Sequence, residues 1–370
     1  MRPLEGLLVL DFSTLLPGPM ATLLLAEAGA DVIKIERPGG EEMRHYAPRW
    51  GAESANFALL NRGKKSLALD LKDRAERDRL RPLLERADVL VEQFRPGVMA
   101  RLGLDYARVA AINPRIVYCS ITGYGQTGPK RDVAGHDLNY IGDAGLLAVS
   151  MGDLDRPVVP PALIADIAGG AYPAVLNILL ALRERDHAGL GRHLDVSMSD
   201  NLFPFLYWAL GSGLAAGVWP GNGDALVTGG TPRYRLYPTR DGRVVAAAPI
   251  EQRFWDIFCD VVDLEPELRD DSRDRAATIA RVAEIVRGAD AETWRARFQG
   301  RDCCCSIVAD LREAMADPHF RERSLFAHVL ANAEGRTLPA LPVPIDPAFR
   351  APPGTPLGAA PLGAHNDDYL

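Results

Sequence analysis

The sequence lacks an excess of basic residues. Its 370 residues include 42 Lys and Arg against 49 Asp and Glu, which gives a formal net charge of −7 at pH 7. Proteins that bind the phosphate backbone of nucleic acids need a basic surface, so we expect no nucleic-acid partner. A local cationic pocket for one phosphorylated ligand remains compatible with this overall charge.

The chain also lacks paired cysteines. Its five cysteines are Cys119, Cys259 and the consecutive Cys303, Cys304 and Cys305, with no CxxC pair and no spacing typical of a disulfide framework. Free cysteine packs as a small apolar residue in reducing compartments. We therefore expect reduced, mostly buried thiols, and the sequence assigns no role to the run of three.

Long apolar runs and targeting signals are missing too. A strand begins almost at once at residues 7–10, which leaves no room for an N-terminal signal segment. The most apolar later stretch, residues 171–182, is too short to span a bilayer and is soon followed by charged residues. The final Asp-Asp-Tyr-Leu is not a peroxisomal address. We expect a cytoplasmic protein without a membrane partner.

The first third of the chain alternates between strand and helix patterns. Short β-branched runs at residues 7–12, 31–36, 66–71, 88–91 and 116–121 predict strands, and helical patterns at residues 19–28, 72–87 and 106–112 separate several of them. This alternation is typical of a parallel sheet covered by helices on both faces. A longer helical pattern follows at residues 168–185.

The length of 370 residues exceeds what one hydrophobic core usually serves, so we expect two domains. The composition turns glycine-rich near residues 221–230, and an Asp-Gly turn at Asp241 then predicts a β-hairpin. We predict an α/β fold with a doubly wound, Rossmann-like large domain over residues 1–220. A smaller α+β domain spans residues 221–330, and residues 331–370 return to the large domain.

One motif points misleadingly to a dinucleotide. Residues 123–128 read Gly-Tyr-Gly-Gln-Thr-Gly, which satisfies G-x-G-x-x-G, and Glu36 ends the second predicted strand. The dinucleotide fingerprint belongs in the first strand–helix turn, and the motif is absent there. No apolar helix follows Gly128 either, so we reject a nicotinamide site.

Cations near the predicted strand ends favour a different ligand. Arg37 follows the second strand, Arg95 follows the fourth, and Lys64 and Lys65 lead into the third. Ligands of parallel sheets bind at loops beyond the strand ends. Several such loops with cations suit a ligand that carries several phosphates, although a scatter of solvated surface charge would give the same spacing.

Several motifs together resemble the family III CoA-transferase superfamily (CaiB/BaiF type), and within it the α-methylacyl-CoA racemases. The first are Ala28-Gly-Ala-Asp-Val-Ile-Lys-Ile-Glu-Arg-Pro38, Asn61-Arg-Gly-Lys-Lys-Ser66 and Phe94-Arg-Pro-Gly-Val98. Those that follow are Gly123-Tyr-Gly-Gln-Thr-Gly-Pro129, Gly135-His-Asp-Leu-Asn-Tyr140 and Ala165-Asp-Ile-Ala-Gly-Gly170. The match covers nearly the whole chain in order, which makes it more specific than any single motif.

The resemblance implies an interlocked homodimer that acts on acyl-CoA thioesters, with no metal and no cofactor, since coenzyme A is part of the substrate. It assigns the adenosine and phosphates to Arg37, Lys64 or Lys65, and Arg95. It assigns the lining of the ligand channel to the loop that begins with Gly123, Tyr124, Gly125 and Gln126. The acyl group itself is not specified.

The resemblance also implies the chemistry. A racemase of 2-methylacyl-CoA inverts the carbon beside the thioester through an enolate, which needs two proton carriers on opposite faces. These would be His136 and Asp166, with Glu251 of the small domain orienting the imidazole. Asp166 would precede the long helix, whose free N–H groups could stabilise the enolate oxygen. Such a helix start lowers the pKa of a carboxyl group and an apolar pocket raises it, so the pKa of Asp166 stays open.

The alternatives keep the same fold. In a CoA-transferase of this superfamily, Asp166 would attack the thioester as a nucleophile, and no base would be needed on the opposite face. A non-catalytic acyl-CoA-binding protein would keep the cationic loops and lose the catalytic set, yet both sets are present here. Asp137 is expected to cap the helix that follows it, with a second acid near the site as the alternative. Glu251 has the alternative role of capping a helix that starts at residue 252.

Overall fold

The computed structural model describes residues 2–354 and 356–370, which form two compact units. The first unit comprises residues 1–144, 161–204 and 318–370, and the second comprises residues 145–160 and 205–317. These bounds differ from the expected 1–220, 221–330 and 331–370. Residues 145–160 and 205–220 belong with the second unit, and the chain returns to the first unit at residue 318.

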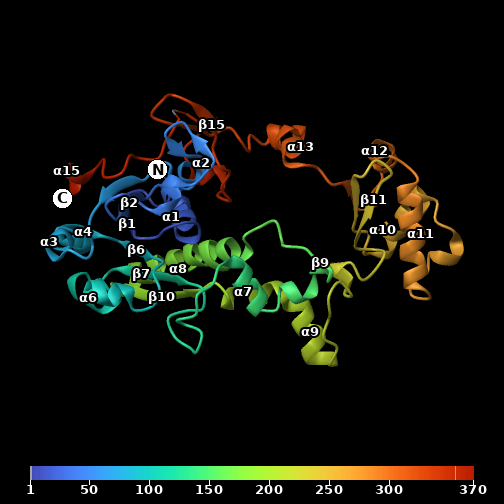
Figure 1. Cartoon of the computed structure of the whole chain (residues 1–370), viewed down its shortest axis with the longest axis horizontal. Coiled ribbons are helices and arrows are strands. Elements are labelled where there is room, and N and C mark those ends of the chain that lie inside the picture. The colour runs from blue at the N-terminus through green and yellow to red at the C-terminus, as the bar shows by residue number, and fades with distance from the viewer. Residues whose placement is uncertain (1, 355) are drawn as a thin grey trace. The chain divides into compact units, whose positions relative to one another are not determined.

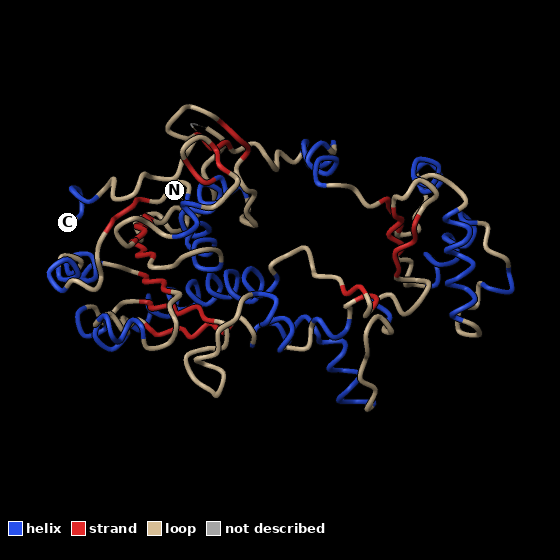
Figure 2. The backbone as a smooth tube through the Cα atoms, in the orientation of Figure 1, coloured by secondary structure: helices blue, strands red, loops and turns tan. Residues whose placement is uncertain are grey.

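A six-stranded parallel sheet forms the centre of the first unit (Figures 1 and 2). Its strands are β1 (Leu8–Asp11), β2 (Asp31–Glu36), β5 (Lys65–Ala68), β6 (Val89–Glu92), β7 (Val117–Thr122) and β10 (Arg192–Ser197). The spatial order β5-β2-β1-β6-β7-β10 is the doubly wound order, with its switch point between β1 and β6. The prediction of a doubly wound large domain is confirmed.

Helices cover both faces of this sheet. Those of the first unit are α1 (Pro17–Glu27), α2 (Ala55–Asn61), α3 (Arg74–Asp78), α4 (Arg81–Arg86), α5 (Val98–Leu102), α6 (Tyr106–Ile112), α7 (Asp137–Asp143), η3 (Ala165–Ala171), α8 (Tyr172–Ala188), α14 (Pro318–Glu322) and α15 (Asn366–Tyr369). Side chains of α4, α5 and α6 pack with alternate residues of the strands in one core, while α1 and α8 pack on the other face. The single helix expected at residues 72–87 is two short helices, broken before Pro82.

The helix expected at residues 168–185 is longer than its pattern. A π-helical stretch, η3, runs directly into α8, so one continuous helical segment spans Ala165–Ala188. By length and composition alone this segment could cross a membrane, with a mean hydropathy of 1.5, whereas residues 171–182 alone are too short. It packs against β7, β10 and α1 in the first unit, and this packing buries Ala174, Ile178, Ala181 and Leu182.

The second unit contains a three-stranded antiparallel sheet of β11 (Arg235–Pro238), β12 (Val244–Ala247) and β13 (Cys305–Ile307). Its helices are α9 (Tyr207–Ala216), α10 (Gln252–Val262), α11 (Arg275–Arg287), α12 (Ala291–Phe298) and α13 (Leu311–Ala316). Trp255, Phe258 and Trp294 lie at its core. The predicted hairpin around Asp241 and the α+β class of this region are both present.

Shorter two-stranded pairs complete the fold. They are β3 (Arg49–Trp50) with β4 (Glu53–Ser54), β8 (Gly152–Asp153) with β9 (Arg156–Pro157), and β14 (Val329–Ala331) with β15 (Thr337–Pro339). The C-terminal residues return to the sheet of the first unit. His365 and Asn366 there exchange hydrogen bonds with the backbone of Ser66 and Ala68 on the outer strand β5.

Candidate active site

The candidate catalytic residues His136 and Asp166 line one cavity of about 490 Å³ in the first unit. We call it the His136 cavity. Loops after β1, β6 and β7 contribute to its wall, which places it at the carboxyl edge of the sheet beside the switch point. Its other lining residues are Thr14, Leu15, Pro17, Gln93, Phe94, Arg95, Pro96, Ile121, Thr122, Gly123, Tyr124, Arg131, Val133, Ala134, Gly135, Asn139, Tyr140 and Met198.

His136 is exposed and takes the N-cap position of α7. Its backbone N–H donates to Oδ1 of Asn139, 3.1 Å away, which fixes the start of the helix. Within the described residues the imidazole ring has no hydrogen-bond partner, so it is free to meet a ligand. The cap expected at Asp137 is therefore wrong, because Asp137 is the first residue inside α7.

Asp137 instead supports the second candidate carrier. It is buried, and its Oδ1 accepts the backbone N–H of Asp166 at 2.9 Å. Burial, and to a smaller extent the negative charge of Asp137, raise the pKa of Asp166 to about 7. The apolar environment therefore outweighs the helix start in setting the protonation of Asp166, which becomes suited to proton transfer near neutral pH.

The expected free N–H groups at the start of the long helix are not free. Asp166 lies within η3, and its N–H is bound to Asp137. The N–H of Ile167 is bound to the carbonyl of Leu163. The prediction that these groups point at a thioester oxygen is wrong for both residues, since each donor already has an acceptor.

The loop that begins at Gly123 is held close to α7. An added Cβ at Gly123 would lie 2.3 Å from the ring of Tyr140, so only glycine fits there. The hydroxyl of Tyr124 donates to Oδ2 of Asp143 at 2.6 Å, and its ring meets Tyr140 edge to face. Gly125 takes a φ of 83°, and Gln126 donates its N–H to Asp195. Gly123 and Tyr124 line the His136 cavity, while Gly125 and Gln126 shape the loop behind them.

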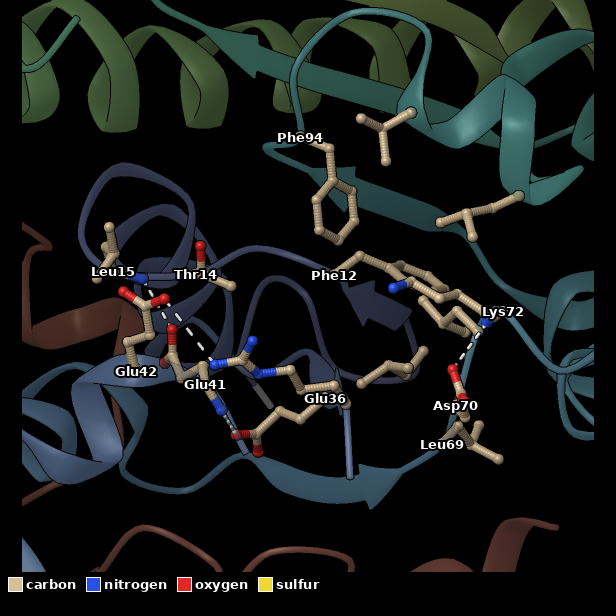
Figure 3. Close-up of a pocket in the computed structure, with 15 residues that line it drawn as sticks. Phe12, Thr14, Leu15, Glu36, Glu41, Glu42, Leu69, Asp70, Lys72 and Phe94 are labelled. Atoms are coloured by element: carbon tan, nitrogen blue, oxygen red, sulfur yellow. Dashed lines mark hydrogen bonds and ion pairs between the residues drawn. The ribbon is translucent and has the colours of Figure 1, made fainter. Parts of the chain in front are cut away.

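A second cavity of about 420 Å³ lies on the other side of the switch point (Figure 3). We call it the Arg37 cavity. It is lined by residues that follow β1, β2, β5 and β6, including Arg37, Lys72 and the rings of Phe12 and Phe94. Thr14, Leu15 and Phe94 line both cavities, so the two adjoin.

The four cations expected to hold coenzyme A separate into two groups. Arg37 and Arg95 follow β2 and β6, are exposed, and line the Arg37 cavity and the His136 cavity respectively. Lys64 precedes β5 and Lys65 is its first residue, so both lie at the amino edge of the sheet and line neither cavity.

The lysines have other partners. Lys64 is buried, and its Nζ contacts Oδ2 of Asp11 at 3.1 Å together with oxygens of Pro19, Thr22 and Asn61. Burial lowers its pKa to about 8. Lys65 pairs with Asp31 and donates to Tyr369. Lys64 has no donor left for a phosphate, so its assignment as a ligand is corrected to a structural role.

Glu251 belongs to the second unit and does not line the His136 cavity. It is exposed and takes the N-cap position of α10, although its side chain forms no capping hydrogen bond. Helix α10 starts at residue 252 with Glu251 at its N-cap position, as the capping alternative expects, but the capping hydrogen bond itself is missing.

Sequence reasoning missed several residues of the two cavities. Arg131 adds a second cation to the His136 cavity, and Lys72 adds one to the Arg37 cavity. Gln93 and Thr122 stand at the ends of β6 and β7. Their positions just after predicted strands were available as a signal, but polar residues at strand ends are too common to single out.

Glu92 is a further buried carboxyl beside the site. Its Oε2 accepts the N–H of Phe94 at 2.8 Å, which shapes the turn that carries Phe94 and Arg95. Burial raises the pKa of Glu92 to about 7, and a hydrogen bond from Ser120 partly opposes that shift. The side chain thus supports a turn shared by both cavities.

Comparisons with known proteins agree with this geometry. The profile of CoA-transferase family III matches residues 4–366. The chain is 34% identical over 341 residues to an alpha-methylacyl-CoA racemase of Mus musculus, which covers 91% of this chain and 84% of the relative. It is 32% identical over 340 residues to a succinyl-CoA:glutarate CoA-transferase of Homo sapiens, which covers 88% and 76%.

A shorter match reaches a higher identity. It is 38% over 277 residues to an acetyl-CoA:oxalate CoA-transferase of Acetobacter aceti, which covers 73% of this chain and 69% of the relative. Among solved structures, a CAIB/BAIF family protein from Brucella suis superposes with a TM-score of 0.83 at 28% identity, over 99% of this chain and 98% of the other. Both racemases and transferases are therefore among its relatives.

Proposed function

Because this chain belongs to CoA-transferase family III, we propose that it is a racemase of 2-methylacyl-CoA thioesters that works by proton transfer. The observation that carries the proposal is the pairing of His136 and Asp166 on one cavity wall. An imidazole is a common general acid and base in enzymes, and burial together with the charge of Asp137 raises the pKa of Asp166 to about 7, which suits it to exchange protons near neutral pH.

The proposed reaction begins with His136 neutral and Asp166 protonated. His136 removes the proton from the carbon beside the thioester, and the electron pair of the broken C–H bond moves into the enolate. Asp166 then returns its proton to the other face of that carbon, which leaves an imidazolium and a carboxylate. The opposite enantiomer reacts in the reverse order, so each group serves once as acid and once as base.

In the proposal, the ligand extends over both cavities. Arg37 and Lys72 in the Arg37 cavity suit the phosphates of coenzyme A, and Phe94 offers a ring face for its adenine. Arg95 and Arg131 line the His136 cavity, where the thioester would lie. Lys65 has no part in this arrangement, because it lies at the amino edge of the sheet.

Two further features of the proposal come from the family resemblance. Glu251 orients the imidazole of His136, and two copies of the chain form an interlocked homodimer. Apolar side chains of α9 support the second feature, since Tyr207 and Leu214 are 76% and 77% exposed within the described part of one chain. Size-exclusion chromatography with light scattering should give twice the mass of 40.2 kDa.

The second candidate function is a CoA-transferase. The acetyl-CoA:oxalate and succinyl-CoA:glutarate CoA-transferases among the relatives favour it. In that reaction the Asp166 carboxylate would attack the thioester carbonyl, the C–S bond would break with release of the coenzyme A thiolate, and the acyl group would stay on Asp166 as a mixed anhydride. A nucleophilic carboxylate has to be ionised, and a pKa of about 7 leaves Asp166 partly protonated at neutral pH. The racemase reaction uses both protonation states and is therefore our first proposal.

The test follows the α-proton of an optically active 2-methylacyl-CoA in heavy water. The racemase proposal expects deuterium at the α-carbon together with loss of optical activity. His136→Ala should slow exchange by roughly 10²-fold to 10⁴-fold. Transfer of coenzyme A to an added dicarboxylate without α-exchange, undiminished in His136→Ala, would establish the transferase instead.

A further inference from the structure

The turn after β1 carries a strained residue between the two cavities. Leu15 takes a φ of +60°, a left-handed conformation that bulky residues rarely adopt. Its side chain lines both the Arg37 cavity and the His136 cavity. Backbone strain of this kind persists only where the surrounding structure holds it in place.

Two buried charged residues hold this turn. Oε2 of Glu41 accepts the N–H of Leu15 at 2.8 Å, as drawn in Figure 3. Nζ of Lys34 donates to the carbonyl of Ser13 at 2.8 Å. Lys34 and Glu41 also form an ion pair of 3.3 Å, with side chains that are 1% and 2% exposed. Lys34 and Glu41 thus hydrogen-bond the backbone of the turn on both sides of Thr14.

Burying this ion pair costs desolvation free energy for both of its charges. Burial raises the pKa of Glu41, Lys34 opposes that shift, and the nearby carboxylates Asp11 and Glu36 add to it. Buried ion pairs often add no net stability over apolar residues of similar size. Its contacts with the backbone of Ser13 and Leu15 give it a different use.

We propose that Lys34 and Glu41 are positioning residues that hold the turn at Leu15 as a fixed wall between the two cavities. The turn is then already ordered in the free protein. A ligand that occupies both cavities therefore binds without the loss of conformational entropy that ordering the turn would otherwise cost. The effect on ligand affinity rests on the proposed acyl-CoA function. The rigidity of the turn does not, and it can be measured in the free protein.

Two double variants distinguish the effect of the oxygen that accepts the Leu15 N–H from the effect of the buried charges. Lys34→Met with Glu41→Gln removes both charges and keeps an oxygen that can accept the Leu15 N–H. Lys34→Met with Glu41→Leu removes that oxygen as well. Glu27→Gln is the matched control, since Glu27 pairs with buried Arg62 and lines neither cavity.

Hydrogen exchange of the free protein should accelerate at residues 12–18 by about 10-fold or more in the Leu variant, the loss expected for one hydrogen bond. The Gln variant keeps an acceptor for the Leu15 N–H and loses the Lys34 contact with Ser13, so its exchange rate should lie between those of the wild type and the Leu variant. The Kd for coenzyme A and the KM for the acyl-CoA should rise about 10-fold in the Leu variant, by the same reasoning, with little change in kcat. Glu27→Gln should leave all of these unchanged.

Leu15→Gly provides a test that leaves the buried pair intact. Glycine relaxes the left-handed turn and lets it adopt other conformations, so exchange at residues 12–18 and the Kd should both rise while the unfolding midpoint stays. Wild-type exchange in Leu15→Gly, or in a folded Leu variant, overturns the positioning role. Failure of the wild type to bind coenzyme A overturns the proposed function, and the exchange data still decide the role of the pair.

Discussion

The backbone N–H of Asp166 donates a 2.9 Å hydrogen bond to the carboxylate of Asp137. This contact joins the first turn of η3 to the first turn of α7, the helix that His136 caps. It also brings a negative charge close to the Asp166 carboxyl, which increases the pKa shift that burial begins. Asp137, which follows His136 in the sequence, thus helps to set the pKa of Asp166, the other proposed proton carrier.

Asp137→Asn should lower the pKa of Asp166. The amide oxygen can still accept the N–H, but the negative charge is gone, and burial alone then raises that pKa. Activity in the direction that needs ionised Asp166 falls as the pH drops through its pKa. We therefore expect that limb of the kcat profile to move to lower pH. Asp105→Asn, which changes a capping carboxyl on α6, should leave the profile unchanged.

Asp166→Asn should stabilise the protein above neutral pH. The pKa of Asp166 is about 7 in the folded protein, against an ordinary aspartate value of 3.8 in the unfolded chain. Between these two pH values the folded state keeps a proton that the unfolded chain has lost. Stability therefore falls as the pH rises from about 4 to 7 and stays lower above that range. The amide avoids this loss, so the free energy of unfolding should rise on the order of 2–4 kcal/mol at pH 8. Urea titrations at pH 4 and pH 8 compare the two, and an equal gain at both would contradict the assignment.

Arg37→Met and Lys65→Met distinguish the two edges of the sheet. Arg37 lines a cavity at the carboxyl edge, whereas Lys65 pairs with Asp31 at the amino edge. Loss of one charge-assisted contact to phosphate should raise the KM for acyl-CoA roughly 10-fold in Arg37→Met. Lys65→Met should leave the KM at the wild-type value. An equal rise in both variants would show that the ligand does not follow the cavities.

Lys64→Met should act on stability and not on binding. Asp11 would keep a buried carboxylate without its ammonium partner, and breaking a buried pair in this way costs about 3–5 kcal/mol. Adding Asp11→Asn removes the orphaned charge, so the double variant should regain part of that loss. Denaturant unfolding measures both. A single variant as stable as wild type would show that Lys64 is dispensable to the fold.

The sheet could be predicted because its signal is local. Strands β1, β2, β6 and β7 are short, mostly apolar runs that are almost wholly buried, and such runs stand out in a sequence. Helix ends were less certain. Ala165 and Asp166 join the long helix through a π-helical stretch, and no periodicity of the apolar side chains marks that start.

The site was predicted only where chemistry and resemblance agreed. His136 and Asp166 share a cavity as expected, because each stands in a motif quoted for the resemblance. Lys64 was assigned to the ligand because a lysine pair beside a strand looks like a phosphate site. A lysine pair can reach a ligand of this sheet only from the carboxyl end of a strand. Lys64 instead precedes β5, and its ammonium group pairs with the buried carboxylate of Asp11. The partnership of Asp137 with Asp166 depends on packing between two helices, which no spacing in the sequence encodes.

The last residues of the chain have a consequence for how the protein is made. Strand β5 is one of the two edge strands of the sheet, and His365 and Asn366 supply the hydrogen bonds that its outer edge would otherwise offer to another chain. During synthesis these two residues leave the ribosome long after β5 has emerged. Until then the edge of β5 stays open to pairing with other nascent chains.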